Sequence, residues 1–236
     1  MAEERQQEIV QNIQDVRAAI ATVPHKENAR LVAVSKLKPV EDLQYAYDAG
    51  QRHFGENYVQ ELVEKSAKMP QDIAWHFIGH LQSNKCKLVA AIPNLFVVET
   101  IDSIKKADAM NKACVSCERA KPLRVFVQVN TSREEAKGGV APEQCSDVCK
   151  HIVQHCPQLE LGGLMTIGMF GRDPSIDNPD FLCLADCKKT ADEVLGKGSD
   201  LELSMGMSAD YLQALQAGAT NVRVGTTIFG ARPKKP

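Results

Sequence analysis

The sequence has 236 residues, of which 44% are hydrophobic and 25% are charged, and its formal net charge is −2. These values are typical of a soluble globular protein and lack the basic excess of proteins that bind nucleic-acid phosphates. No apolar run could span a bilayer, and the acidic start MAEERQQEIVQNIQ resembles neither a secretion signal nor a transit peptide, so we expect a cytoplasmic protein without membrane or nucleic-acid partners.

The first predicted element is an amphipathic helix over residues 3–22, in which Ile9, Ile13, Val16 and Ile20 fall on one face. Short runs with the composition of strands follow it. In chain order they cover residues 31–36, 53–57, 75–79, 95–100, 123–131, 159–168, 201–207 and 221–226. Helical runs lie between them, at residues 39–50, 58–69, 83–92, 103–120, 141–156, 179–198 and 208–219.

The regular alternation of strands and helices predicts a parallel sheet. Eight such units in a chain of 236 residues predict a closed (β/α)₈ TIM barrel, with the helix over 3–22 as an addition at its N-terminus. We expect residues 1–236 to form this single domain. The alternative is an open doubly wound sheet, which usually has only about five or six strands.

The eight cysteines do not favour a metal or redox site. Cys114 and Cys117 form a CxxC motif, but it lies within a predicted helix and has no partner motif at zinc-finger spacing. Two further pairs are each spaced one helical turn apart, Cys145 with Cys149 and Cys183 with Cys187. A chain of this length buries a sufficient core without disulfides, so we expect ordinary thiols.

The first predicted strand, LVAVSK, ends on Lys36. Side chains alternate along a strand, so Lys36 shares a face with Val32 and Val34. If that face points inward, Lys36 stands at the barrel mouth, where the active residues of such barrels gather. If it points toward the helices, the lysine only extends its ammonium group to water. Lys36 alone does not decide between the two.

The other strand ends carry small and polar residues. Asn57 ends the second strand, Met165 and Thr166 lie in the sixth, and the seventh runs into the segment 204–208. The eighth has Gly225 and Thr226 at its end. In (β/α)₈ barrels the loops after strands 7 and 8 often bind phosphate, and Gly, Ser and Thr suit that purpose. Ordinary turn and capping chemistry would explain either loop alone.

Arg223 shares a face with Gly225, so it is expected one layer deeper in the barrel. Its guanidinium stays charged, so burial requires either a carboxylate partner or an acceptor atom on a ligand. An amine at Lys36, a phosphate cradle and this cation match the aldehyde, the phosphate and the ring nitrogen of pyridoxal phosphate. A Schiff-base aldolase acting on a sugar phosphate would use the same lysine and phosphate site, and this alternative stays open.

The sequence resembles the pyridoxal phosphate homeostasis protein family, whose barrel is related to the N-terminal domain of bacterial alanine racemase. The resemblance runs through nearly the whole chain in order. It rests on LVAVSK (31–36), HFGENYVQE (53–61), WHFIGHLQSNK (75–85), VNTS (129–132), GLMTIG (163–168), LSMGMSADY (203–211) and VRVGTTIFG (222–230). One departure is Arg133, which stands where the family usually has glycine, and it puts any inherited role of that loop in doubt.

The resemblance implies a set of cofactor contacts. Lys36 is expected to form the internal aldimine with pyridoxal 5′-phosphate, and Arg223 to face the ring nitrogen. The residues expected to hold the phosphate are Ser204, Gly225 and Thr226, together with the backbone of Met205, Gly206, Met207 and Ser208. The residues expected to line the ring are Asn57, Met165 and Thr166.

The resemblance also implies a cofactor-binding and supply protein rather than an enzyme. Racemases use a second base, a tyrosine from a partner's C-terminal β-domain, and we expect no such domain here. An arginine at the ring nitrogen also weakens the cofactor as an electron sink. We expect a monomer, with pyridoxal-phosphate-dependent apoenzymes as suggested recipients. A racemase-like enzyme is the main alternative, with Tyr58 and Tyr211 as the tyrosines nearest the mouth. A lyase without cofactor and a scaffold with a degenerate site are weaker alternatives.

Overall fold

The computed structural model describes residues 2–26, 28–173, 175–196 and 201–231. Eight parallel strands pair in chain order and close into a barrel, because β8 pairs with β1. The fold is therefore the predicted (β/α)₈ barrel, and the open sheet is excluded. The strands are β1 (Arg30–Val34), β2 (His53–Glu56), β3 (Ala74–Phe77), β4 (Leu95–Ile101), β5 (Leu123–Gln128), β6 (Leu159–Met165), β7 (Glu202–Ser204) and β8 (Asn221–Val224).

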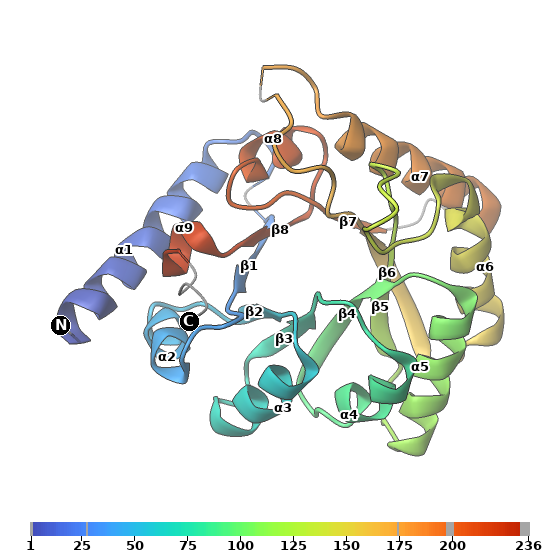
Figure 1. The fold of residues 1–236 in the computed structure, drawn as a ribbon, viewed down its shortest axis with the longest axis horizontal. Helices are drawn as coiled ribbons and strands as arrows, with labels where there is room; N and C mark the ends of the chain where they lie inside the picture. The colour runs from blue at the N-terminus through green and yellow to red at the C-terminus, as the bar shows by residue number, and fades with distance from the viewer. Residues whose placement is uncertain (1, 27, 174, 197–200, 232–236) are drawn as a thin grey trace.

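Helices surround this barrel (Figure 1). They are α1 (Ala2–Ala21), α2 (Val40–Asp48), α3 (Val59–Lys68), α4 (Cys86–Ala90), α5 (Ile104–Ser116), α6 (Cys145–His155), α7 (Pro179–Leu195), α8 (Tyr211–Gln216) and α9 (Thr226–Phe229), with short 3₁₀ turns at Ser83–Lys85 and Pro142–Gln144. The predicted helix over 179–198 ends earlier, at Leu195, and residues 197 and 198 lie outside the described part. No helix in the described ranges is long and apolar enough to cross a membrane.

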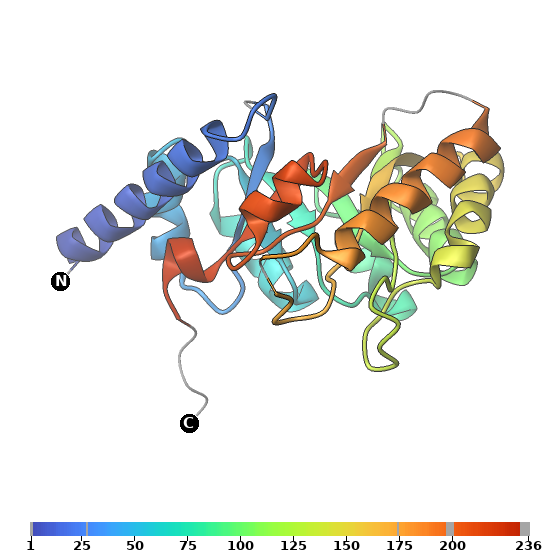
Figure 2. The same cartoon turned by 90° about the horizontal axis from the view of Figure 1, so that it is seen from above.

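The N-terminal helix α1 packs outside the barrel against α2 and α9 (Figures 1 and 2). Its four predicted core residues, Ile9, Ile13, Val16 and Ile20, are all buried. Arg5 also ties the helix to the barrel end, since its Nη2 donates hydrogen bonds to Asp42 Oδ2 at 2.6 Å and to the carbonyl of Phe229 at 2.8 Å. The 3.6-residue period of the apolar side chains thus identified this helix and its buried face correctly.

Most of the apolar core lies between the strands and the helices, and the barrel interior is more polar. Alternation along β1 separates the two regions: Ala33 belongs to the outer core, while Val32 lies inside the barrel close to Gly55. A small second apolar cluster of Val97, Phe126 and Met165 fills part of the interior. Below, the mouth is the barrel end formed by the C-terminal ends of the strands, and the base is the opposite end.

Several strands end earlier at the mouth than the sequence predicted. β6 ends at Met165 rather than at residue 168, and β8 ends at Val224 rather than at residue 226. Thr226 instead begins the short helix α9, which the sequence did not indicate. The reason is physical: at the mouth the chain leaves the sheet while its residue types still favour a strand, so composition alone does not mark the end.

Candidate cofactor site at the barrel mouth

A cavity of about 880 Å³ opens at the mouth. Eight of the twelve residues that the sequence predicted for the cofactor site line it. They are Lys36, Asn57, Met165, Met207, Ser208, Arg223, Gly225 and Thr226. Thr166, Ser204, Met205 and Gly206 are not among the lining residues. The strand ends therefore bring most of the predicted set to one place.

Lys36 lies two residues beyond the end of β1, in the turn that follows it. Val34 lines the same cavity, so the face shared by Val32, Val34 and Lys36 points inward. Of the two orientations that the sequence allowed for Lys36, the structure thus has the one toward the barrel mouth rather than the one toward the helices. Leu37, the next residue, has a φ of 61°, a left-handed conformation that turns the chain sharply away.

Buried polar contacts fix the turn that carries Lys36. Ser35 is completely buried, and its hydroxyl donates a hydrogen bond of 2.6 Å to Glu56 Oε1. Lys65 Nζ donates to the same carboxylate oxygen at 2.7 Å and to the carbonyl of Ser35 at 2.9 Å. Burial raises the pKa of Glu56, and the Lys65 ammonium opposes that rise. The turn is thus positioned before any ligand arrives.

Arg223 is held from inside the barrel while it lines the cavity. Its Nη1 donates to Ser204 Oγ at 2.7 Å, and its Nη2 donates to the carbonyl of Thr166 at 2.8 Å. The Ser204 hydroxyl in turn donates to Glu99 Oε2 at 2.5 Å. Burial lowers the pKa of Arg223, and the Glu99 carboxylate counteracts this. The buried carboxylate that an interior arginine requires is therefore Glu99.

A chain of hydrogen bonds continues from Glu99 toward the base. His76 Nδ1 lies 2.6 Å from Glu99 Oε1, and His76 Nε2 lies 2.9 Å from His53 Nδ1. Burial would raise the pKa of Glu99, but the hydrogen bond from His76 and the charge of Arg223 outweigh it and lower that pKa. Glu99 is thus a carboxylate. Sequence analysis missed this residue, although one glutamate in the apolar strand LFVVETI was a signal.

The loops after β7 and β8 meet at Ser208. Its hydroxyl oxygen accepts hydrogen bonds from the backbone N–H groups of Gly225 at 3.2 Å and Thr227 at 3.4 Å. A side chain at Gly225 would bring its Cβ to 3.2 Å from Val34 Cβ, so the close approach of these strands favours glycine. Two backbone donors that now bond a hydroxyl oxygen are suited to an anion.

Ser204 has a different position from the one its predicted role suggests. Its side chain is completely buried and its hydroxyl is engaged by Glu99 and Arg223 inside the barrel. Thr166 is also buried, and its hydroxyl donates to the carbonyl of Val129 at 3.0 Å. Both residues support the lining from below, and their direct contact with a ligand stays a prediction.

Asn57 lines the cavity and carries a buried polar atom without a partner in the described part of the chain. Within the described ranges, no group donates a hydrogen bond to its buried Oδ1. Its backbone is packed so closely against Gly79 that a Cβ on that glycine would lie 1.9 Å from the carbonyl oxygen of Asn57. A buried acceptor without a donor is costly, and this one belongs to a residue that lines the cavity.

Further lining residues come from the loop after β6 and from α8. Phe170 is 84% exposed, and Arg172 is fixed by a 2.9 Å hydrogen bond to Asp180. Tyr211 lines the cavity, whereas Tyr58 is 52% exposed and is not a lining residue. Sequence reasoning named no residue of the loop after β6 beyond Thr166, because exposed loops lack the periodicity on which such reasoning depends.

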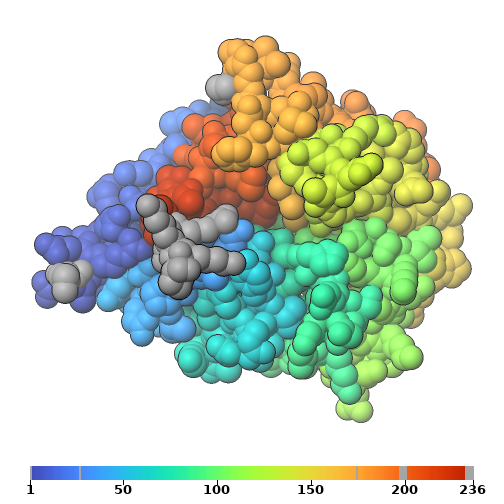
Figure 3. Space-filling model, in the orientation of Figure 1, coloured from blue at the N-terminus to red at the C-terminus, as the bar shows by residue number. Residues whose placement is uncertain are grey.

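The loop that carries Arg133 lies beside the loop after β6 (Figure 3), and Lys137 Nζ donates to the carbonyl of Gly168 at 2.7 Å. Arg133 has a φ of 56°, in the region where glycine is least strained. This conformation suits the glycine of the resembling family. Here the arginine side chain reaches Glu143 and forms an exposed ion pair with it.

Comparisons with known proteins agree on the family. Residues 5–233 match the model of the alanine racemase N-terminal domain. The pyridoxal phosphate homeostasis protein of Schizosaccharomyces pombe is 51% identical over 223 residues, which cover 94% of this chain and 92% of that protein. The human protein of the same name is 48% identical over 233 residues, which cover 94% of this chain and 85% of that protein.

Solved structures give the same result. PipY of Synechococcus elongatus, a structure with PLP bound, aligns with a TM-score of 0.78 and 31% identity over 94% of this chain and all of that one. Alanine racemase of Corynebacterium glutamicum shares the fold, with a TM-score of 0.73 and 16% identity over 96% of this chain and 62% of that one. The chain belongs to the pyridoxal phosphate homeostasis protein family, built on the barrel of the alanine racemase N-terminal domain.

Proposed function

We propose that this chain, as one domain over residues 1–236, binds pyridoxal 5′-phosphate at the mouth and takes part in its intracellular supply without catalytic turnover. One observation carries the proposal: Lys36, Arg223 and the Gly225 backbone line a single cavity of about 880 Å³. An amine, a fixed cation and an anion cradle match the three polar parts of this cofactor. The family name and the cofactor in PipY support the same assignment.

In this proposal different residues contact different parts of the cofactor. Lys36 holds the cofactor as a Schiff base, a bond that exchanges with other amines and so allows release. The backbone N–H groups of Gly225 and Thr227 turn from Ser208 to the phosphate, with Thr226 beside them. Arg223, fixed by Ser204 and Thr166, donates to the ring nitrogen. Asn57 and Met165 flank the ring.

A role as carrier rather than enzyme is supported by the proton-transfer groups at the cavity. Racemisation needs an acid or base on each side of the cofactor plane. Tyr211 is the tyrosine that lines the cavity within the described part of the chain, and burial raises its pKa, so its phenol resists giving up a proton. The cation at Arg223 also disfavours protonation of the ring nitrogen, which weakens carbanion chemistry. Racemase-like activity through Tyr211 is the alternative.

We propose the cytoplasm as the location, a monomer as the form, and pyridoxal-phosphate-dependent apoenzymes as the recipients. The net charge of −2 gives no electrostatic reason for nucleic-acid or membrane partners. Exchange of the Schiff base with an amine on the recipient would pass the cofactor on without any other reactant.

The test is the absorbance spectrum of the purified protein with pyridoxal 5′-phosphate, followed by borohydride reduction and peptide mapping. We expect visible absorbance and a reduced adduct on Lys36, and loss of both in Lys36→Ala. Lys38→Ala is the matched control, because Lys38 lines the same cavity but donates to the carbonyls of Phe229, Gly230 and Ala231. Burial lowers the pKa of Lys38, so it is the competing amine.

An adduct on Lys38 would make the assignment of Lys36 wrong. No chromophore at all would mean that the cavity takes another ligand. Turnover of an amino acid enantiomer at an enzymic rate, lost in both Lys36→Ala and Tyr211→Phe, would replace the carrier by a racemase. Equilibration that is no faster than with free cofactor supports the carrier.

A further inference from the structure

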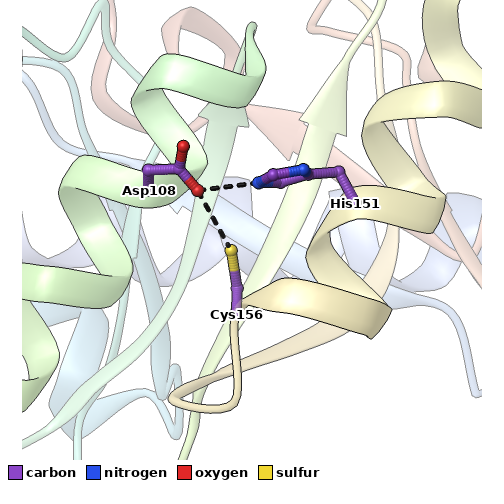
Figure 4. A group of neighbouring side chains, drawn as sticks. All are labelled: Asp108, His151 and Cys156. Atoms are coloured by element: carbon purple, nitrogen blue, oxygen red, sulfur yellow. Dashed lines mark hydrogen bonds and ion pairs between the residues drawn. The ribbon is translucent and has the colours of Figure 1, made fainter.

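A second group of chemically active side chains lies on the outer layer of the barrel, between α5 and α6 (Figure 4). We call Asp108, His151 and Cys156 the α5/α6 cluster. Asp108 comes from α5, His151 from α6, and Cys156 is the C-cap residue of α6. None of the three lines the mouth cavity, so the inference below does not depend on the proposed function.

The three side chains converge on one point. The carboxylate Oδ1 of Asp108 lies 2.7 Å from His151 Nε2 and accepts a hydrogen bond of 3.7 Å from the Cys156 thiol. The three potential ligand atoms all lie within 4.8 Å of one another. Figure 4 shows the ring and the thiol both directed at the carboxylate. Asp108 Oδ1 thus accepts hydrogen bonds from both His151 and Cys156.

Packing holds this arrangement from both sides. Cys156 is 1% exposed, and the following residues lead directly into β6. The backbone N–H of Gln158 donates to Asn111 Oδ1 on α5 at 2.9 Å, which fixes the segment after Cys156 against α5. The Asp108 side chain is 56% exposed, so an ion can reach the cluster from solvent. The cluster is therefore preorganised and accessible.

We propose that the α5/α6 cluster binds one divalent transition-metal ion of the zinc class. Zinc is held by thiolate, imidazole and carboxylate at about 2.3, 2.0–2.1 and 2.0–2.2 Å, so its tetrahedral ligands lie roughly 3.3–3.8 Å apart. The contact between Asp108 and His151 has to open from 2.7 Å by less than about 1 Å to reach this spacing. The contact between Asp108 and Cys156, at 3.7 Å, already has this spacing, and the remaining pair lies within 4.8 Å.

Metal binding at the cluster releases a proton to solvent. The thiol of Cys156 gives its proton to solvent as the metal–sulfur bond forms. His151 exchanges its Nε2 proton with solvent for one on Nδ1 and binds through Nε2 as neutral imidazole, and Asp108 binds as a carboxylate. Because metal binding releases the thiol proton, affinity rises with pH.

The fourth position faces solvent. His155 lies one helical turn after His151, with ring centroids 4.9 Å apart, and its side chain is exposed. We assign the fourth position to water, because His155 has to turn away from solvent to reach the ion while water needs no such change. The sequence HIVQHC held a signal for this cluster, an HxxxH motif followed by cysteine, but Asp108 lies 43 residues before His151.

The experiment is a titration of the full chain with Co²⁺ and then Zn²⁺, recorded as difference spectra against the metal-free protein. We expect one Co²⁺ per chain, with a thiolate-to-cobalt charge-transfer band and the visible bands of a tetrahedral site, both removed by Zn²⁺. Cys156→Ser abolishes the charge-transfer band and weakens zinc binding about a hundredfold or more. Asp108→Asn, at an exposed position, weakens it without loss of folding.

Two matched variants sharpen the test. Cys117→Ser removes a partly exposed thiol at the end of the same helix α5 and leaves the spectra unchanged. His155→Ala changes affinity less than about tenfold if water completes the site. Absence of the thiolate band, or a band that survives in Cys156→Ser, overturns the proposal. A band lost in Cys117→Ser instead assigns the metal to the CxxC motif and also overturns it.

Discussion

The two ends of the barrel use polar side chains in opposite ways. At the base, the carboxylate of Glu202 accepts from Arg30 at 2.5 Å, from Arg124 at 3.0 Å and from Asn221 at 2.7 Å, so its partners all belong to the protein. At the mouth, Arg223 lines a cavity, and Asn57 Oδ1 has no donor within the described ranges. The Glu202 carboxylate at the base is thus paired within the protein and stabilises the fold, whereas Arg223 at the mouth also faces a cavity that can take a ligand.

Glu99 connects these two regions, and its replacement has the largest expected effect. Glu99→Gln keeps the shape but leaves Arg223 buried without a carboxylate, which lowers the free energy of unfolding by about 3 kcal/mol. Because Glu99 also positions Arg223 through Ser204, cofactor binding weakens about tenfold, or about 1.4 kcal/mol. Urea unfolding and a fluorescence titration with pyridoxal 5′-phosphate measure the two changes.

Thr100→Val is the control for this variant. Thr100 is the next residue along β4 and is equally buried, but its hydroxyl has no hydrogen-bond partner in the described structure. Replacing it with an isosteric apolar side chain should change stability by less than about 0.5 kcal/mol. If Glu99→Gln behaved like Thr100→Val, the buried charge of Arg223 would not depend on Glu99.

The next effect is confined to the base. Glu202→Gln removes the charge between Arg30 and Arg124, and we expect the free energy of unfolding to fall by about 2 kcal/mol, a value reduced from that of a fully buried pair because the side chain is 18% exposed. The cofactor spectrum should not change, because Glu202 does not line the cavity. A spectral change would contradict the division between base and mouth.

Glu160→Gln supplies the comparison for Glu202. Glu160 lies 3.6 Å from the same Arg124, but its side chain is 59% exposed. Exposed pairs contribute roughly 0–1 kcal/mol, so this variant should unfold at nearly the same urea concentration as the parent. A loss as large as that of Glu202→Gln would mean that burial does not determine the strength of these contacts.

The sequence predicted the features that depend on local patterns and missed those that depend on contacts across the barrel interior. The eight strand–helix units follow from local periodicity, and Lys36, Asn57 and Gly225 lie at strand ends that any such barrel brings together. Contacts across the interior are different. Ser204 and Glu99 are 105 residues apart, and only the closed barrel makes them neighbours. Their pairing turns the Ser204 hydroxyl away from the cavity, which no local pattern indicates.

The last expected effect depends on pH and concerns His53 at the start of β2. Burial, with the neighbouring His76 and Arg30, lowers the pKa of His53 to about 3. An unfolded chain protonates this residue below about pH 6.5, so between these values the unfolded state binds more protons than the folded one. The free energy of unfolding therefore falls as the pH drops from about 6.5 toward about 3, by at most about 1.4 kcal/mol per pH unit for this group.

His53→Asn removes that contribution, so stability measured by urea unfolding from about pH 6.5 to about pH 4.5 should fall less steeply than in the parent protein. The carboxylates of Glu99 and Glu202, whose pKa values are lowered in the folded state, remain in both proteins and cancel in the difference. His80→Asn, at a side chain 70% exposed, should leave the slope as it is. Equal slopes for His53→Asn and the parent would mean that His53 binds protons to the same extent in the folded and the unfolded state, so that burial does not lower its pKa.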